Sequence, residues 1–586
     1  MDALSAAVSN FKPFRNRRPR DDEDEGETTD HPLAGGGHAG RETERILQVR
    51  VSTALRHFLV DERILAKEHA GLNDPDHQHS QQLRRLLLQP HAIVPPELTD
   101  RSHPLQDYFV SSSHNTYLLA HQLYGKASAE AYEEHLKAGA RCVEIDAWDG
   151  EDNDEPKVTH GWTLTQHIPF KDVCETIRDV VDHEQSQSFE QQGHRPSPVL
   201  ISLENHCGPQ GQLRMVEIMK EVFGDRLLSK PVRDKGHRAQ AGMPDDSISL
   251  AELGNKIVLI VEYHFPEEKV ESGEEESDLD DDEREELRRY RKKKEEAAPS
   301  AIIIPELSEL GVYAQSVKPP SNAWFEKGIL DGSPHHPLIN ISETGLASHL
   351  PTHAQLIAQH NSNHLMRVYP KGTRVSSGNL NPVPFWNVGA QICALNWQTF
   401  GAAMQLNEAL FTGTDGYVLK PTYLRQGGRS VEKLAKKRKL RLHVAGATDV
   451  PVPADRAQDG SDIKPYLTCS LINPSHEGPD PEPSKQKTRP YRQHHLTASF
   501  HHHSNPPNVD PIWNDVLEWE YEDSELAFLR LLIKSDDAFA ANPKLAVAAV
   551  RLLYVVENEW VFIRMLSLKG QETTCTLLVM FEFVDD

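Results

Sequence analysis

Two short apolar runs of the sequence carry side chains that suit a bound cation. His114 and Asn115 follow the first run, and Glu144 and Asp146 lie within the second. Side chains alternate along a β-strand, so Glu144 and Asp146 would point to the same face and repel each other unless a cation lay between them. Amide and carboxylate oxygens suit a hard cation such as calcium better than they suit zinc. These residues therefore predict a calcium site.

Two later segments add an imidazole and a third carboxylate. His160 lies in a Thr-His-Gly segment, and Glu204 lies in a Leu-Glu-Asn-His segment. A single carboxylate at a strand end more often caps a helix or pairs with a base than binds a metal. Four successive segments that end in His-Asn, Glu-x-Asp, His and Glu favour a catalytic site instead. An imidazole there could act as an acid or a base near neutral pH.

The elements that must position these residues alternate between strands and helices. Predicted strands cover Tyr108–Ser112, Cys142–Trp148, Lys157–His160, Val199–Glu204 and Ile257–Tyr263. A predicted helix over Glu130–Lys137 joins the first two, and Gly139 suits its carboxyl end. This alternation indicates a parallel α/β fold, in which functional side chains gather at the carboxyl ends of the strands.

A charged segment interrupts this pattern. Residues 267–286 hold thirteen acids and two bases, and bases cluster directly after them. Such charge segregation is typical of a linker or an insertion. Strand signals resume at Leu338–Ile341, His364–Tyr369, Gln391–Trp397 and Gly416–Lys420. We therefore expect one α/β domain that is split by the charged segment.

The two ends of the chain differ from its middle. Apolar residues recur at helical spacing between Ile46 and Leu59 and again over Leu83–Leu88, which predicts a small helical unit. After the basic run Lys433–Arg441, short strand-like segments separated by turns predict a β-sandwich. Residues 1–43 mix charges with glycine and predict a disordered tail.

Several motifs together resemble the eukaryotic phosphoinositide-specific phospholipases C of delta type. They are SSSHNTYL at 111–118, CVEIDAWDG at 142–150, HGWTLT from His160, LISLENHCG from Leu200, ISE at 341–343, RVYPKG at 367–372, PVPFWNVGAQICALNWQT around Trp386 and GYVLKP ending at Pro421. The motifs follow the order of the family's X and Y catalytic halves. The resemblance covers the chain from about Leu105 to the C-terminus.

The resemblance implies an α/β fold class with a distorted TIM-type (β/α)8 barrel, split by the charged linker, between EF-hand-like helices and a C2 β-sandwich. The expected boundaries are a disordered tail at 1–43, an EF-hand-like helical unit at 44–100, the X half at 101–265, the acidic and basic linker at 266–300, the Y half at 301–425, a basic linker at 426–439 and the C2 domain at 440–586. Residues 44–100 contain no calcium-binding EF-hand loop motif, so we expect a structural unit there. An anionic membrane would repel the acidic linker, which suggests an autoinhibitory role.

The resemblance also implies roles for individual residues. Calcium would be held by Asn115, Glu144, Asp146 and Glu204. His114 would stabilise the charged transition state, Glu144 would take the proton of the inositol 2-hydroxyl, and His160 would protonate the departing diacylglycerol oxygen. The products would be diacylglycerol and an inositol phosphate formed through a cyclic intermediate.

Head-group recognition matches the family only in part. Ser342, Arg367 and Tyr369 stand where the family binds ring phosphates and stacks beneath the inositol. A guanidinium fork suits phosphate, and a tyrosine face suits the apolar side of the ring. The family normally carries two lysines on its fifth strand, whereas this chain has Ile260 and Glu262 there. The expected substrate is therefore phosphatidylinositol 4,5-bisphosphate or a less phosphorylated phosphoinositide.

Composition limits the partners and the location. Acids exceed bases by 88 to 63, a net charge of -25, which argues against a general nucleic-acid binder. No run approaches the roughly 20 apolar residues that span a bilayer, the N-terminus lacks an apolar signal stretch, and six dispersed cysteines suit a reducing compartment. We expect a cytoplasmic monomer that is peripheral to anionic membranes and binds a phosphoinositide. The sequence identifies no upstream protein activator.

Two other functions remain as alternatives. A catalytically weak scaffold that binds phosphoinositides is favoured by Ile260 and Glu262, but the intact His114, His160 and calcium-ligand set speaks against it. A barrel enzyme for glycerophosphodiesters would also use histidine with glutamate and aspartate. Such an enzyme would not need the head-group residues at 342, 367 and 369 or the split barrel.

Overall fold

The computed structural model describes most of the central α/β unit of the chain and parts of both flanking units. The described residues are 49–72, 79–119, 126–150, 155–159, 167–190, 196–232, 248–264, 302–319, 323–326, 334–371, 374, 378–428, 436–454, 456, 460–474, 484–493, 505–536 and 543–585. The predicted tail at 1–43, the catalytic candidate His160 and the linker at 266–300 lie outside these residues, as do residues 429–435 of the basic linker.

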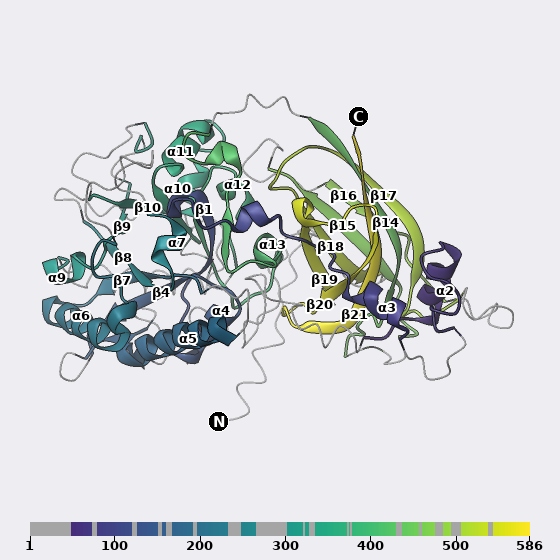
Figure 1. Cartoon of the computed structure of the whole chain (residues 1–586), viewed down its shortest axis with the longest axis horizontal. Helices are drawn as coiled ribbons and strands as arrows, with labels where there is room; N and C mark the ends of the chain where they lie inside the picture. The colour runs from purple at the N-terminus through teal and green to yellow at the C-terminus, as the bar shows by residue number, and fades with distance from the viewer. Residues whose placement is uncertain are drawn as a thin grey trace, which may run out of the picture.

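Within the described residues, eight parallel strands close into a barrel (Figure 1). In their order around the barrel they are β1 (Tyr108–Ser113), β4 (Cys142–Trp148), β7 (Val199–His206), β8 (Ile257–Glu262), β9 (Gln315–Val317), β10 (Pro337–Ser342), β11 (Leu365–Tyr369) and β12 (Ile392–Leu395). Strand β1 closes the ring because it pairs with β12 on one side and with β4 on the other. The predicted TIM-type fold class is confirmed.

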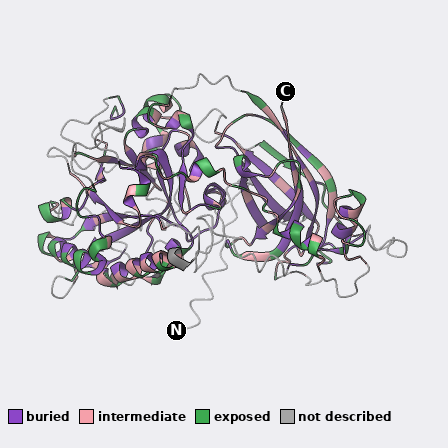
Figure 2. Cartoon of the chain, in the orientation of Figure 1, coloured by how far each residue is buried: buried purple, intermediate pink, exposed green. Residues whose placement is uncertain are grey.

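Helices cover the outside of the barrel. They are α4 (Glu130–Lys137), α5 (Phe170–Glu190), α6 (Pro209–Phe223), α7 (Leu250–Leu253), α9 (Pro305–Ser308), α10 (Glu343–Ala347), α11 (Ala354–Asn361), α12 (Val383–Trp386) and α13 (Ala402–Phe411). Figure 2 shows buried strands surrounded by helices whose outer faces are exposed. Helix α4 has the predicted bounds, and Gly139 follows it with φ 107°, a conformation that favours glycine. No helix among the described residues is long and apolar enough to cross a bilayer.

The third predicted strand was wrong as a barrel strand. It shortens to β5 (Lys157–Val158), which pairs antiparallel with β4 and with β6 (Ile168–Pro169). The described part of this predicted strand is thus a short hairpin strand at the edge of β4. In contrast, β9 belongs to the barrel but was not predicted, because three residues are too few to show a periodic pattern.

The C-terminal unit is a β-sandwich, as predicted. Its strands are β14 (Lys437–Thr448), β15 (Pro465–Ile472), β16 (Ser484–Lys487), β17 (Ile512–Glu522), β18 (Phe528–Ser535), β19 (Lys544–Arg551), β20 (Trp560–Leu566) and β21 (Glu572–Asp585). They form the layers β16-β15-β18-β19 and β20-β21-β14-β17, which are joined by one described pairing between Val547 and Leu566. Side chains of both layers, such as Leu442 and Leu529, share one buried core.

The predicted N-terminal helices pack on the sandwich. They are α2 (Thr53–Asp61) and α3 (Gln81–Leu88), and each begins after a serine whose side chain accepts a backbone hydrogen bond. Leu55 and Leu83 lie in one buried cluster with Phe562 and Leu578 of the sandwich. The helical unit therefore covers the outer face of the β20–β21 layer, in a cluster separate from the core between the layers.

The predicted basic linker at 426–439 overlaps β14, which begins at Lys437, and the bases of this strand face acidic residues of the sandwich. Arg438 pairs with Glu557, Lys439 with Glu518, and Arg441 with Glu582. Acids on the neighbouring strands thus balance much of the positive charge that could attract anionic lipid.

The barrel and the sandwich share a hydrophobic core. Trp386 of α12 lies against Phe528 of β18, with ring centroids 5.9 Å apart. Buried Arg530 donates a hydrogen bond of 2.6 Å to Gln405 of α13, and the Tyr554 hydroxyl donates to the Leu410 carbonyl at 3.0 Å. These contacts fix the sandwich against one side of the barrel.

We predict that Phe528→Ala lowers the free energy of unfolding by about 3–5 kcal/mol, because it removes a buried ring from the shared core. Chemical denaturation followed by tryptophan fluorescence would measure the change. The control is Val516→Ala. Val516 lies on β17 and is 50% exposed, so this change should alter the free energy of unfolding by less than about 0.5 kcal/mol. Equal stability of the two variants would contradict this account of the interface.

Candidate active site

Three carboxylates meet at the carboxyl ends of β4 and β7. Asp146 pairs in register with Glu204, and Glu144 lies two residues before Asp146 on the same face. Each of the three offers an oxygen within 4.8 Å of the others'. The structure thus brings together the three predicted acidic ligands.

The electrostatics of this cluster favour a bound cation. Burial and the charges of Glu204 and Glu144 raise the pKa of Asp146 well above its usual value. Burial and the charge of Glu144 likewise raise the pKa of Glu204. In the described part of the chain, Asp146 Oδ1 is buried and has no hydrogen-bond partner. A divalent cation would balance the repulsion and give that oxygen a partner.

Asn115 lies beside the carboxylates in a left-handed conformation, with φ 46°. Asparagine tolerates this conformation better than most residues. Its backbone N–H donates to Glu144 Oε2 at 2.7 Å, and its side-chain Oδ1 lies 3.1 Å from the Tyr117 hydroxyl. That hydroxyl lies only 2.5 Å from Asp146 Oδ2, to which it donates. Tyr117 therefore holds two of the four predicted ligands in place.

Arg367 supplies a positive charge within the barrel. Its side chain is 1% exposed, and Nη2 donates to Glu144 Oε1 at 2.7 Å. Nη1 donates to Asn340 Oδ1 at 3.1 Å. The sequence predicted Arg367 as a phosphate ligand, and here it is the counter-ion of a predicted calcium ligand.

His114 lies between these carboxylates and β12. Its Nδ1 is 2.8 Å from Asn396 Oδ1, which can only accept, so Nδ1 carries the proton. Nε2 lies 3.9 Å from Glu144 Oε2. Burial and the charge of Arg367 lower the pKa of His114 to about 4. The imidazole is therefore neutral near pH 7, with Nε2 directed toward the carboxylates. The second predicted histidine, His160, lies outside the described residues.

The predicted head-group residues lie together at the ends of β10 and β11. Ser342 pairs in register with Tyr369, and Ser342 caps α10 by accepting from the Gly345 N–H. The guanidinium carbon of Arg367 is 5.7 Å from the centre of the Tyr369 ring. The structure thus brings this set to one side of the barrel mouth, next to the carboxylates.

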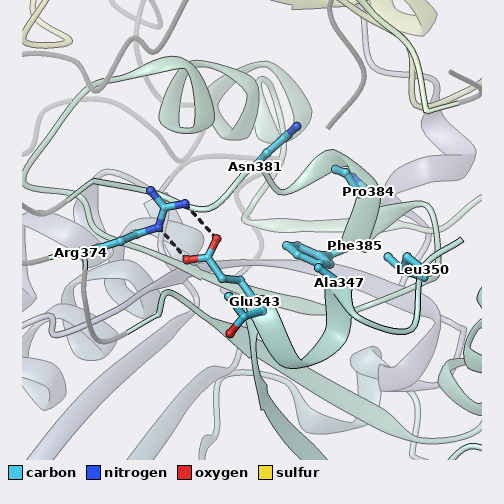
Figure 3. Close-up of a pocket in the computed structure, with 8 residues that line it drawn as sticks. Glu343, Ala347, Leu350, Arg374, Asn381, Pro384 and Phe385 are labelled. Atoms are coloured by element: carbon cyan, nitrogen blue, oxygen red, sulfur yellow. Dashed lines mark hydrogen bonds and ion pairs between the residues drawn. The ribbon is translucent and has the colours of Figure 1, made fainter. Parts of the chain in front are cut away.

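A pocket adjoins this side of the mouth (Figure 3). Glu343, directly after Ser342, lines it together with Arg374 and the ring of Phe385. Arg374 forms two hydrogen bonds with the Glu343 carboxylate, at 2.6 and 2.9 Å. The backbone N–H of Lys371 donates to the same carboxylate at 2.8 Å. This network holds the segment after β11 against α10.

Sequence reasoning assigned no role to Tyr117, Asn340 or Asn396. Tyr117 lies in the SSSHNTYL motif, two residues after Asn115. This closeness in sequence could have indicated that Tyr117 lies near the predicted ligand. Asn396 lies in the segment after β12, far from His114 in the sequence. No local pattern links those two residues, because their contact exists only once the barrel closes.

Comparisons with known proteins agree with this geometry. Residues 101–263 match the family described as phosphatidylinositol-specific phospholipase C, X domain, and residues 307–423 match its Y domain. The chain is 35% identical over 452 residues to 1-phosphatidylinositol 4,5-bisphosphate phosphodiesterase delta-3 of Mus musculus, which covers 76% of this chain and 52% of that protein. It is 30% identical over 504 residues to the delta-1 enzyme of Homo sapiens, covering 83% of this chain and 61% of that protein.

The chain thus spans about half to three fifths of the length of these relatives. Among solved structures, the crystal structure of L. pealei PLC21 matches with a TM-score of 0.64 and 23% identity, covering 93% of this chain and 69% of that one. That match supports the fold.

We predict that Glu204→Gln stabilises the cation-free protein, because it removes one of three mutually repelling carboxylates. The melting temperature in a calcium chelator should rise by roughly 2–4 °C. Added calcium should raise the melting temperature of the wild type but raise that of the variant much less.

Scanning calorimetry would measure both effects. Glu309→Gln, at an exposed position beyond α9, is the control for loss of charge and should behave as the wild type does. A destabilised Glu204→Gln variant in chelator would be inconsistent with repulsion among the three carboxylates.

Proposed function

We propose a function for this chain on the premise that it belongs to the eukaryotic phosphoinositide-specific phospholipases C and is delta-like. The proposed function is that of a calcium-dependent phosphodiesterase that acts on phosphoinositides in membranes. It would release diacylglycerol and an inositol phosphate. The observation that carries the proposal is the convergence of Asn115, Glu144, Asp146 and Glu204 with His114 at the carboxyl ends of the barrel strands.

The residues present fit calcium. Asn115, Glu144, Asp146 and Glu204 can each offer an oxygen ligand, and among the described residues the buried Asp146 Oδ1 has no hydrogen-bond partner. Bound calcium would lower the pKa of the inositol 2-hydroxyl and neutralise charge on the phosphate. Tyr117 keeps Asn115 and Asp146 oriented for that ion.

The protein's own groups account for the proton transfers. Glu144 accepts the proton of the 2-hydroxyl, and hydrogen bonds from Arg367 Nη2 and the Asn115 N–H fix the position of its carboxylate. The hydroxyl oxygen then attacks the adjacent phosphorus, and the bond from phosphorus to the diacylglycerol oxygen breaks. His160 donates a proton to that departing oxygen. Water afterwards opens the cyclic phosphate to an inositol phosphate.

His114 would act on the phosphate itself. Asn396 fixes the ring through Nδ1 and leaves Nε2 facing the site. An anionic phosphodiester beside Nε2 favours the protonated imidazole, which then donates a hydrogen bond to a phosphoryl oxygen. The role of His114 is thus to stabilise the charge that develops in the transition state.

The location follows from the substrate. The lipid lies in a membrane, so we propose a protein that acts at the membrane surface. A phosphoinositide-binding scaffold is the second candidate, because Ile260 and Glu262 replace the basic residues that the family carries. Turnover separates the two functions.

We expect release of water-soluble inositol phosphates from mixed vesicles that contain phosphatidylinositol, its 4-phosphate or its 4,5-bisphosphate, and this release should depend on free calcium. His114→Ala should reduce the rate by about 10²–10⁴-fold. His183→Ala, at an exposed position on α5, is the matched control and should not reduce it. A folded, vesicle-bound wild type that releases nothing from any of the three lipids would favour the scaffold.

We further expect Tyr117→Phe to weaken calcium binding by about 10–100-fold, because the variant loses the hydroxyl that orients Asn115 and Asp146. Calorimetric titration of the lipid-free chain with calcium would measure this directly. Tyr491→Phe removes a hydroxyl that contacts a carbonyl in the sandwich and serves as the control. Equal calcium affinity of both variants would rule out this role for Tyr117.

A further inference from the structure

A row of carboxylates runs across three neighbouring strands of the barrel mouth. Asp146 of β4 is in register with Glu204 of β7. Leu203 is in register with Val261, which places the next residues, Glu204 and Glu262, side by side on β7 and β8. Side chains at equivalent levels of adjacent parallel strands point to the same face. Glu262 therefore extends the acidic row beyond the three carboxylates of the candidate calcium site.

Contacts of Glu262 agree with this placement. Its Oε2 accepts a hydrogen bond of 3.1 Å from the Asn205 N–H, directly after Glu204. Among the described residues, the carboxylates close enough to share a cation are Glu144, Asp146 and Glu204, and Glu262 is not one of them. A cation bound by those three would thus not be coordinated by Glu262.

The rest of β8 offers nothing that would bind an anion. Ile260 lies two residues below Glu262, is 1% exposed and is in register with Ser202. Near the mouth, β8 thus presents an apolar side chain, Ile260, and a carboxylate, Glu262, to the interior of the barrel. A phosphate on this side would meet negative charge.

The opposite side of the mouth has the reverse character. Ser342 and Tyr369 end β10 and β11, and Arg367 lies two residues before Tyr369. In the next segment, the backbone N–H of Lys371 donates to Glu343, which lines the pocket of Figure 3. The β10–β11 side thus presents the Arg367 guanidinium, a hydroxyl and a tyrosine ring, whereas carboxylates line the mouth from β4 to β8.

We propose that Glu262 is a specificity-determining residue that excludes a phosphate from the part of the inositol ring that faces β8. The preferred substrate is then a phosphatidylinositol with at most one ring phosphate, bound on the β10–β11 side. The inference rests on the proposed function, because it concerns the substrate of the same site. Selection by repulsion of the wrong ligand is a common means of specificity.

Glu262→Gln tests the proposal because glutamine keeps an oxygen that can accept from the Asn205 N–H. Initial rates of inositol phosphate release would be measured with the full chain at saturating calcium, on vesicles containing phosphatidylinositol, its 4-phosphate or its 4,5-bisphosphate. The wild type should favour the first two lipids over the bisphosphate. The variant should raise the rate on bisphosphate relative to phosphatidylinositol by about tenfold or more, since it removes a unit charge near the added phosphate.

Glu306→Gln is the matched control. It removes the same charge from exposed α9, which packs against β8 from outside the barrel, and it should leave the ratio of rates unchanged. A wild type that cleaves the bisphosphate at least as fast as phosphatidylinositol, with the same ratio in Glu262→Gln, would overturn the proposal while leaving the proposed function intact.

Release from none of the lipids would instead count against the proposed function. The role of Glu262 would then be decided by calorimetry with soluble inositol 1,4-bisphosphate and inositol 1,4,5-trisphosphate. Glu262→Gln should gain affinity for the trisphosphate relative to the bisphosphate. An unchanged ratio of the two affinities would overturn the proposal.

Discussion

Repulsion among Glu144, Asp146 and Glu204 is the interaction that the rest of the barrel mouth must balance. Three acids within 4.8 Å of one another are unfavourable in a buried site unless positive charge or hydrogen-bond donors face them. Arg367 supplies one charge through Glu144, and the Asn115 N–H and the Tyr117 hydroxyl supply donors. Arg367 comes from β11, whereas Asn115 and Tyr117 both come from the segment after β1, so the balance exists only in the closed barrel.

The frame that resists this repulsion is built from continuous apolar strands. Strands β4, β7 and β8 are buried along almost their whole length, and polar side chains occur mainly where they reach the mouth. Such strands are typical of parallel sheets that are covered on both faces. The core of the barrel thus supports a destabilising cluster at one end, as is common for functional sites.

Local pattern explains which parts of this architecture the sequence could predict. The strands β4 and β7 and the helix α4 have long, regular patterns, and their predicted positions agree with the structure. Strand β9 has three residues and β5 has two, so neither carries a readable period. The acidic ligands were predicted because the alternation of side chains is a local property. The Arg367–Glu144 pair joins residues that are far apart in the sequence, and only barrel closure brings them into contact.

The core that α12 and α13 share with the sandwich has a geometric consequence. Trp386 against Phe528 and Gln405 against Arg530 make the two units one body, so the mouth keeps a constant direction relative to the loops of the sandwich. When either unit binds an extended surface, the orientation of the other unit and its distance from that surface are therefore fixed. The second contact then occurs at an effective concentration set by rigid geometry, without the entropy loss of a flexible tether.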